Sequence, residues 1–255
     1  MKIIGLIAEY NPFHNGHRYQ IKKIKEIFPD SLIILCLGSY FTQRGDISIL
    51  SKQDKVKISL EYGIDLIVEL PLMYTVQSGD IFAYQSIKIL NSLGIDTLVF
   101  GSESNDIEFL HKLALKQESP LYQEKVRKYL KLGNNYPSAL AKALEVNFSF
   151  KSNDLLGISY LKAINKINPN IKAVTIKRTN NYLDTVSDDN IISASNIRDR
   201  FYREEDVSKY TPCYKELIRI DYSLYFKLLK SKIMTLDNLD NYLDVNEGID
   251  NLLKK

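Results

Sequence analysis

Apolar blocks of strand length alternate with amphipathic segments of helix length over much of the chain. Residues 2–8 (KIIGLIA) form a continuous apolar run, and residues 16–28 then place their apolar side chains near helical spacing. The same order recurs, with further strands predicted at 31–38, 64–71, 95–103 and 171–178, and helices at 51–63 and 78–94. Strands separated by helices pair in parallel through right-handed crossovers. We therefore expect an α/β protein with a Rossmann-like parallel sheet of about five strands and helices on both faces.

Helix and loop patterns occupy the remaining segments. Residues 105–167 are mostly helical in pattern, residues 180–190 form a polar loop, and residues 193–201 begin another helix. After Phe201 the pattern breaks into helical fragments such as 214–229, with no further strand.

This change of pattern predicts a domain boundary between residues 202 and 210. We expect a catalytic domain at residues 1–205 and a helical C-terminal segment at residues 206–255.

Composition narrows the setting without identifying a partner. The 255 residues include 34 basic and 31 acidic side chains, and the net charge of +3 permits an anionic partner without requiring one. Cys36 and Cys213 have no CxxC or Cys/His spacing, so we expect reduced thiols. The N-terminal apolar run is too short for a signal peptide or a membrane span. We expect a cytoplasmic protein with no membrane contact.

The segment AEYNPFHNGH follows the first predicted strand and holds two of the three histidines. Ligands of open α/β sheets bind at the carboxyl ends of strands, and a helix N-terminus there favours an anion. Gly16 permits close approach of a ligand to the backbone, and His17 falls in the first helical turn. His14 and His17 are thus candidate donors to nucleotide phosphates. The alternatives are helix caps, packed rings, or a His-x-x-His metal site that lacks a nearby third ligand; His111 is expected on a helix surface.

A second anion-binding pattern lies far downstream in ISASNIRDRF, residues 192–201. Ser193 and Ser195 can cap the helix that follows, and Arg198 lies one turn later, so hydroxyls, free backbone N–H groups and a guanidinium can face one anion. A plain serine-capped helix with a solvated arginine is the alternative. Together with the histidines, the segment favours a triphosphate that is held at both ends.

These two segments resemble the HIGH-type nucleotidyltransferase superfamily, in which the first grips the α-phosphate region and the second the β and γ phosphates. Within that superfamily the chain is similar to the tRNA(Met) cytidine acetate ligase family. The resemblance rests on GLIAEYNPFHNGH, SYFTQRGD, VFGSES, SNDLLGISYLKAI and IKRTNNYLD, which occur in consistent order from residue 3 to about 201.

The resemblance implies that ATP activates acetate to acetyl-adenylate and that the acetyl group then passes to N4 of the wobble cytidine of elongator tRNA(Met). Mg²⁺ would bridge the phosphates, and no metal-ligating residue is assigned. The implied catalytic residues are His14, His17, Ser193, Ser195 and Arg198.

The resemblance also implies a set of ATP-binding residues. They are Gly5, Leu6, Ile7, Ala8, Glu9, Tyr10, Asn11, Pro12, Phe13, His14, Asn15, Gly16, His17, Arg18, Tyr19, Gly101, Asn153 and Arg178. Three of them have a plain alternative: Gly101 ends a strand, Asn153 caps a helix, and Arg178 is a surface charge.

Contacts with acetate, adenylate or RNA are expected elsewhere. Gln43 and Arg44, in SYFTQRGDIS, are candidates for acetate, adenylate or the tRNA backbone, and a solvated loop is the alternative. Lysine-rich runs at 22–25, 125–131 and 227–232 are candidates for tRNA contact, although such runs are commonly solvated helix faces.

The chain departs from the family pattern at three positions. Relatives commonly have Asn at Tyr40, His at Leu183 and Thr at Ser195, where serine keeps the hydroxyl. Relatives also continue beyond VNEGIDNLLKK into a further C-terminal region, which indicates a truncated or short form.

Two other functions fit part of the pattern. One is a nucleotidyltransferase of cofactor synthesis that adenylylates a phosphorylated small molecule, and the other is a non-catalytic ATP-binding module. The Gln-Arg-Gly and SNDLLG blocks favour the tRNA enzyme over the first alternative. The presence of His14, His17 and Arg198 argues against the second.

Overall fold

The protein is described by a computed structural model that covers residues 1–144, 151–178, 190–242, 245 and 249–253. The chain divides into two compact units, residues 1–218 and 219–255. The loop predicted at 180–190 lies outside the described residues except for Asn190, and so does Leu183.

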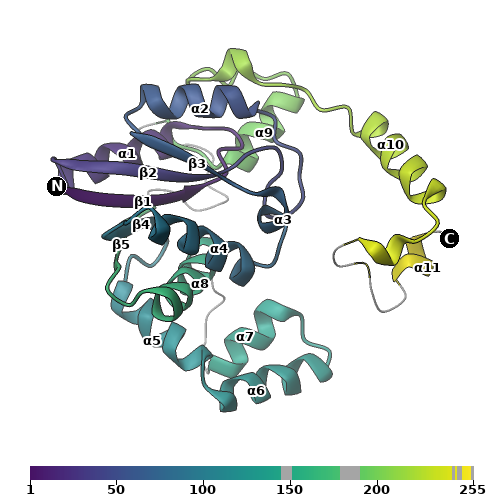
Figure 1. Ribbon diagram of the computed structural model, residues 1–255. Coiled ribbons are helices and arrows are strands. Elements are labelled where there is room, and N and C mark those ends of the chain that lie inside the picture. Colours follow the sequence, from purple (N-terminus) through teal and green to yellow (C-terminus); the bar gives the residue numbers. More distant parts are fainter. Residues whose placement is uncertain (145–150, 179–189, 243–244, 246–248, 254–255) are drawn as a thin grey trace. The chain divides into compact units, whose positions relative to one another are not determined.

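Five parallel strands form the sheet of the first unit, as the apolar pattern predicted. The strands are β1 (Lys2–Ala8), β2 (Ser31–Gly38), β3 (Leu66–Leu70), β4 (Thr97–Ser102) and β5 (Lys172–Lys177). Their spatial order is β3-β2-β1-β4-β5 (Figure 1). In the register of the central strand, Leu6 pairs with Leu35 of β2, and Gly5 pairs with Leu98 of β4.

The strand order places a topological switch point between β1 and β4. The chain builds the sheet outward from β1 to β3 and then returns to the other side of β1 with β4. Loops that leave the carboxyl ends of β1 and β4 diverge at such a point and form a ligand crevice between them.

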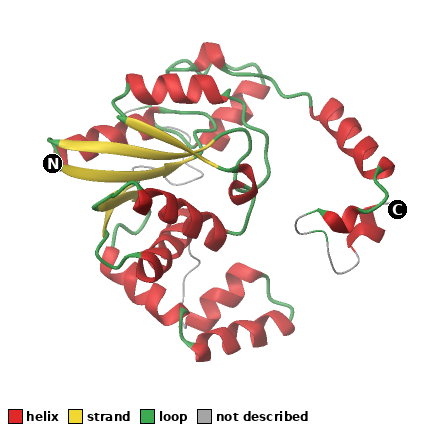
Figure 2. Cartoon of the chain, viewed as in Figure 1, coloured by secondary structure: helices red, strands yellow, loops and turns green. Residues whose placement is uncertain are grey.

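Helices follow the strands and account for most of the remaining described residues (Figure 2). In the first unit they are α1 (Asn15–Ile27), α2 (Lys52–Glu61), α3 (Leu72–Thr75), α4 (Gly79–Ser92), α5 (Ile107–Gln117), α6 (Pro120–Lys131), α7 (Tyr136–Leu144), α8 (Ser152–Ile167), α9 (Ala194–Tyr202) and the short η1 (Tyr214–Glu216). The second unit holds α10 (Tyr222–Thr235), η2 (Leu239–Asn241) and α11 (Ile249–Leu253).

Most of the expected helices are present, and two details differ from expectation. The short helix α3 was not predicted, because four residues are too few to show a helical period. The fragment expected at 214–229 is interrupted, since η1 ends at Glu216 and α10 begins only after its N-cap, Asp221, whose carboxylate accepts from the Leu224 N–H at 3.0 Å.

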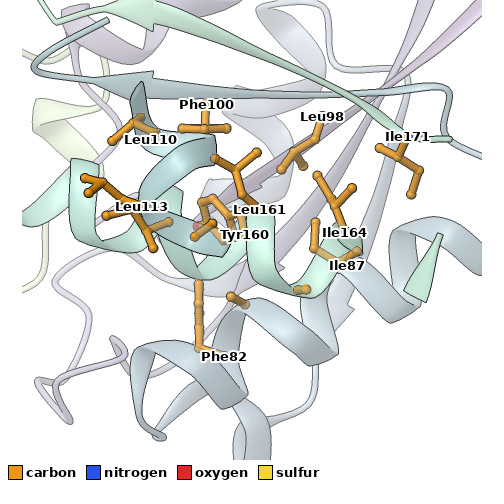
Figure 3. Packing of buried hydrophobic residues seen from close by; sticks show 14 of the residues in the cluster. Phe82, Ile87, Leu98, Phe100, Leu110, Leu113, Tyr160, Leu161, Ile164 and Ile171 are labelled. Atoms are coloured by element: carbon orange, nitrogen blue, oxygen red, sulfur yellow. The ribbon is translucent and has the colours of Figure 1, made fainter. Parts of the chain in front are cut away.

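Alternate residues of the strands pack against different helices on the two faces of the sheet. Leu98 and Phe100 of β4 pack with Phe82 and Ile87 of α4 and Leu161 of α8 (Figure 3). The opposite face contributes Ile4, Leu6, Ile33, Leu35 and Val99, which pack with Ile21 and Ile24 of α1. Helices α1, α2 and α9 cover this second face and α4 and α8 the first (Figure 1). This confirms the predicted covering of both faces.

Residues 206–218 belong to the first compact unit, so the boundary expected at 205/206 falls inside that unit. The physical reason is a set of contacts with the loop after β1. The Thr211 hydroxyl donates to the Phe13 carbonyl at 2.6 Å, the Asn15 N–H donates to the Tyr210 carbonyl at 3.0 Å, and Cys213 packs in the same core as Phe13. Composition does not reveal such long-range contacts.

Cys36 and Cys213 are both buried free thiols, as expected for reduced cysteines. Burial raises the pKa of Cys36 to about 12 and that of Cys213 to about 11. Among the described helices, none has the length and apolar character that crossing a bilayer requires.

Candidate functional site: a nucleotide cleft at the switch point

The two histidines cap the N-terminus of α1 through their ring nitrogens. His14 is the N-cap, and its Nδ1 accepts from the Gly16 N–H at 3.0 Å, while Nδ1 of His17 accepts from the His14 N–H at 3.2 Å. A backbone N–H can only donate, so both Nδ1 atoms are unprotonated and both rings carry their hydrogen on Nε2. The helix-cap alternative is therefore correct as far as it goes, and it leaves two Nε2–H donors for other partners.

Burial keeps both imidazoles neutral. It lowers the pKa of His14 to about 3, with a smaller contribution from the nearby Arg178 guanidinium. The pKa of His17 is lowered well below its usual value by burial first, and then by His14 and Arg178. Each neutral ring keeps one N–H group, on Nε2, that can donate a hydrogen bond to a phosphate oxygen.

The N-terminus of α9 brings the second predicted segment to the loop after β1. Ser193 is the N-cap and accepts from the Asn196 N–H at 3.2 Å, and its hydroxyl lies 2.9 Å from that of Ser195. Arg198 donates from one guanidinium nitrogen to the Asn11 carbonyl at 2.7 Å. The side chain is thus anchored to the loop between β1 and α1, residues 9–14, which we call the histidine loop. It is not a freely solvated arginine.

All five predicted catalytic residues line one cleft of about 590 Å³ in the first unit. The cleft lies at the carboxyl ends of β1 and β4, and its walls come from the 42–46 loop and from α4, α5, α7, α8 and α9. Predicted residues that line it are Ile7, Ala8, Glu9, Tyr10, Asn11, His14, His17, Gln43, Arg44, Gly101, Asn153, Arg178, Ser193, Ser195 and Arg198. Groups far apart in the sequence thus meet in the fold.

A smaller cavity shares His14, His17, Gly101, Arg178 and Ser193 with this cleft. It is also lined by Gly16, Tyr19 and the apolar side chains of Ile176, Ile191 and Ile192. A lining that combines polar and apolar side chains suits a heterocyclic base attached to a phosphate chain.

Two cleft arginines and one amide are left without hydrogen-bond partners among the described residues. The side chain of Arg178 lies across Gly101, and Arg44 extends from the 40–48 loop at the cleft. Neither guanidinium donates a hydrogen bond to another described residue. Asn11 accepts from the Ile49 N–H at 2.9 Å through Oδ1, while its buried Nδ2 has no partner. Of these groups only Nδ2 of Asn11 is buried, since Arg44 is exposed and Arg178 half-buried, and a buried donor of this kind points to a missing acceptor.

The 40–48 loop forms a hairpin in which the Arg44 side chain is exposed to solvent. Ser48 N–H donates to the Tyr40 carbonyl at 2.9 Å, and Phe41 pairs with Ile47. Gln43 donates from its side chain to the Gln77 carbonyl, so this amide NH₂ is occupied by the protein itself.

Glu9 ties the hairpin to the end of β1 and is held in an uncommon electrostatic setting. Its Oε1 accepts from the Gln43 N–H. Burial raises the pKa of the Glu9 carboxyl, opposed by that N–H and by the charges of Lys55, Arg44 and Arg198. Burial also lowers the pKa of Lys55 to about 8, and its ammonium donates to the Ser39 carbonyl at 2.6 Å.

Six of the predicted ATP-binding residues line neither cavity. Gly5 and Leu6 lie inside β1. Leu6 and Phe13, which comes after the strand, are core residues. The Asn15 amide donates to the Lys209 carbonyl at 2.8 Å, and the Arg18 guanidinium lies 5.0 Å from the Tyr62 ring centroid. Pro12 completes this set of residues outside the cavity linings.

The structure adds cleft residues that the sequence did not single out. Tyr160 of α8, Phe82 and Asp80 of α4, and Gln117 of α5 line the cleft. Glu103 lies behind it and accepts from the Asn153 side chain at 2.6 Å, so Asn153 is not the helix cap considered above. The blocks VFGSES and SNDLLG contain these two residues, but nothing in the sequence indicated that they are in contact.

Among the described residues, no group of three or more His, Cys, Asp or Glu side chains is placed to hold a metal ion. The His-x-x-His alternative also conflicts with the Nδ1 atoms, which accept backbone N–H groups. His111 lies exposed on α5, as expected.

Comparisons with known proteins agree with this arrangement. The profile of the family described as HIGH Nucleotidyl Transferase matches residues 1–255. The chain is 39% identical to the tRNA(Met) cytidine acetate ligase of Mycoplasma mobile, over 99% of this chain and 87% of that protein. It is 40% identical to the protein of the same name from Mesomycoplasma hyopneumoniae, over 99% of this chain and 82% of the relative.

A solved structure shares the fold of the whole chain. Thermotoga maritima TmcAL, crystallised with α-thio-ATP, matches with a TM-score of 0.79 and 29% sequence identity. The match covers 100% of this chain and 66% of the Thermotoga protein.

Proposed function

The chain belongs to the tRNA(Met) cytidine acetate ligase family of HIGH nucleotidyl transferases, and we propose from this premise that its cleft activates acetate with ATP. The acetyl group then passes to N4 of the wobble cytidine of elongator tRNA(Met). The observation that carries the proposal is the convergence of His14, His17, Ser193, Ser195 and Arg198 on one cleft.

In the first step, an acetate oxygen attacks the α-phosphorus of ATP in line with the departing pyrophosphate. A P–O bond to acetate forms, the P–O bond to the β-phosphate bridge breaks, and pyrophosphate carries away the electron pair. The two Nε2–H groups of His14 and His17 donate to the α-phosphate, where charge accumulates. The protein contributes positioning and charge neutralisation, with no covalent enzyme intermediate.

The α9 N-terminus receives the departing pyrophosphate. Free backbone N–H groups, two hydroxyls and the Arg198 guanidinium supply donors for its oxygens. Because Arg198 also holds the Asn11 carbonyl, the same side chain joins the pyrophosphate end of the site to the histidine loop. The unpartnered Nδ2 of Asn11 is a further donor at this junction.

In the second step, N4 of cytidine attacks the acetyl carbonyl carbon of acetyl-adenylate. A C–N bond forms, the C–O bond to the adenylate breaks, AMP leaves with that electron pair, and N4 releases one proton to water. The cleft extends past the histidines to α4, α7 and α8, which leaves room for a second nucleoside. Gln43 and Arg44 lie on this route, with the Arg44 guanidinium suited to an acetate or phosphate oxygen.

Mg²⁺ is proposed as a partner of ATP. No carboxylate cage is present among the described residues, which fits a metal held mainly by phosphate oxygens and water. When bound there, Mg²⁺ supplies positive charge to the phosphates.

Exposed basic side chains are proposed to hold the tRNA, with the reaction taking place in the cytoplasm. On α1 these include Lys22 and Lys25, and on α6 they include Arg127 and Lys128. Phosphate contacts of this kind orient RNA without reading its sequence.

Incubation of the protein with ATP, labelled acetate and total tRNA tests the proposal directly. Mass spectrometry of the digested nucleosides should show labelled N4-acetylcytidine, and omission of ATP should abolish it. Pyrophosphate release without labelled N4-acetylcytidine on any tRNA would contradict the second step. Adenylyl transfer to nicotinamide mononucleotide or phosphopantetheine without acetate would instead favour the cofactor enzyme.

A further inference from the structure

Two carboxylates, one in the loop after β4 and one at the N-terminus of α8, each accept backbone N–H groups of the other segment. Glu103 accepts from the backbone N–H groups of Asp154 at 3.0 Å and Asn153 at 3.4 Å, at a helix whose own N-cap residue does not cap it with its side chain. Asp154 in turn accepts from the Ser102 hydroxyl at 2.5 Å and from the N–H groups of Glu103 and Ser104, both at 3.1 Å. The loop and the helix therefore hold each other in place.

One more bond in this arrangement sets the orientation of a cleft side chain. Nδ2 of Asn153 donates to Oε1 of Glu103 at 2.6 Å. A carboxylate can only accept, so the Asn153 amide must turn its NH₂ toward Glu103. Its Oδ1 has no partner among the described residues, and the residue lines the cleft. The bond to Glu103 thus fixes which end of the Asn153 amide is the free acceptor in this cleft-lining residue.

Apolar side chains are part of the same cleft lining. Leu156 comes from α8 itself, Phe82 from α4, and Phe100 from the end of β4. A nucleobase removed from its stack is held by apolar contacts on its faces and by hydrogen bonds at its edge. The side-chain carbonyl of Asn153, in the same lining, is an acceptor of the kind that such an edge contact needs.

We propose that Glu103 is a positioning residue that holds the Asn153 oxygen toward the cleft, where it accepts from the exocyclic amino group of a nucleobase. Two such groups take part in the proposed function, on which this inference rests: the 6-amino group of adenine and the 4-amino group of cytosine. A keto group in the same place, as in guanine or uracil, meets the oxygen acceptor to acceptor. The Glu103–Asn153 pair therefore selects amino against keto bases.

The substitution Glu103→Gln inverts this polarity. Glutamine has one acceptor and one donor group. With its oxygen on the Asp154 N–H, its NH₂ meets Asn153, whose amide then turns its oxygen inward and its NH₂ toward the cleft. The exposed Glu108→Gln, five residues further along the chain, is the matched control.

Acetate-dependent pyrophosphate exchange, measured with ATP and with GTP, tests whether the amino group that Asn153 accepts from is that of adenine. If adenine is held, the ratio of kcat/KM for ATP over GTP falls about tenfold or more in the Glu103→Gln variant. If cytosine is held, that ratio stays as in the unaltered protein. Acetyl transfer from preformed acetyl-adenylate to tRNA then slows by a similar factor.

A second substitution distinguishes polarity from a merely structural role. In the double variant Glu103→Gln with Asn153→Asp, the glutamine NH₂ donates to one carboxylate oxygen and the other oxygen faces the cleft as an acceptor. The quantity lost in the single variant should recover to within a few-fold. Asn153→Asp alone places two carboxylates against each other and should not show this recovery.

The proposal is overturned if Glu103→Gln changes neither quantity more than Glu108→Gln does, or if the double variant recovers nothing. Should Glu103→Gln fail to fold, Asn153→Leu keeps both backbone caps by Glu103 and removes the acceptor. Unchanged selection in that variant is equally contradictory. Calorimetry of ATP and GTP binding makes the adenine comparison without turnover. If the unaltered protein lacks acetate-dependent exchange, the proposed function is refuted, and the calorimetric comparison still tests this inference.

Discussion

The imidazole rings of His14 and His17 lie against each other, with centroids 3.9 Å apart and planes tilted by 32°. Each Nδ1 accepts a backbone N–H of the same helix start, so the pair is locked with both Nε2–H groups available. Protonation of either Nδ1 would remove a helix cap and place a charge beside a buried ring. The two capping bonds therefore require both rings in their neutral form, with the hydrogen on Nε2.

Acid should destabilise the protein through His14. Its pKa is about 3 in the fold, chiefly because of burial and then of Arg178, against about 6.5 in an unfolded chain. The unfolded state binds the extra proton between these values, so this contribution to stability is complete above pH 6.5 and declines as the pH falls toward 3. Between pH 7.5 and 5 the loss is about 2 kcal/mol.

Urea unfolding at pH 7.5, 6 and 5 measures this loss. His14→Asn keeps a side-chain oxygen at the N-cap but does not titrate, so its free energy of unfolding should fall less over the same range. Equal pH slopes for the two proteins would show that His14 is not the titrating group.

Loss of the His17 donor should slow adenylation. His17→Ala removes one Nε2–H group from the α-phosphate, and acetate-dependent ATP–pyrophosphate exchange should fall on the order of 10²-fold. His111→Ala is the matched control, because this exposed histidine of α5 lies away from the cleft lining. Exchange rates that agree between the two variants would remove His17 from the mechanism.

Gly101 should be required by the ligand and not by the fold. A Cβ there would lie 3.4 Å from Cγ of Arg178, an ordinary contact, whereas at Gly157 it would lie 2.6 Å from the Phe100 ring. Gly101→Ala should change the free energy of unfolding by about 0.5 kcal/mol or less, yet raise the KM for ATP severalfold.

Gly157→Ala gives the opposite result, a loss of about 1–3 kcal/mol from overpacking in the core. Thermal unfolding and exchange kinetics of both variants make the comparison. Normal ATP use by Gly101→Ala would mean that no substrate approaches that backbone.

Thr211 should stabilise the histidine loop from outside the predicted catalytic domain. Thr211→Val leaves the buried Phe13 carbonyl without its 2.6 Å hydroxyl donor, which should cost about 1–2 kcal/mol and slow pyrophosphate exchange. In α10, Thr235→Val removes an exposed hydroxyl bonded to the Ser231 carbonyl and should change little. Chemical unfolding followed by circular dichroism distinguishes the two, and equal stabilities would refute the role of Thr211.

The basic face of α6 should contribute to tRNA affinity. Arg127→Gln and Lys128→Gln should weaken tRNA binding, and each should reduce the slope of log Kd against log salt by about one if its side chain neutralises one phosphate. Filter binding from low to moderate salt measures the slope, and ATP affinity serves as the internal control. A slope that does not change would exclude this face from the tRNA site.

Local patterns predicted the sheet well, because strands such as β1 and β2 are largely apolar runs that alternate with helix-length segments. The strand β2, for example, is buried from Ile33 to Gly38 and contains no competing signal. The order β3-β2-β1-β4-β5 was not derivable from such runs, since similar helix-length connections can lead to either side of β1.

The candidate site was predictable where its chemistry is local. His14 and His17 share a single turn, and Arg198 lies one turn after Ser193 and Ser195, so their spacing already suggested anion binding. Contacts between distant segments were not visible in the sequence. Neither residue types nor spacing indicate that Glu103 orients Asn153 or that the Glu9 carboxylate accepts from the Gln43 N–H.

The bond from Arg198 to the Asn11 carbonyl spans 187 positions of the chain, and this has a consequence for biosynthesis. While the ribosome is still adding residues before α9, the histidine loop has no arginine to hold it and no second anchor for a triphosphate. A nascent chain should therefore not bind ATP until α9 has left the ribosome and packed against the histidine loop. Nucleotide capture then becomes a signature of completed folding.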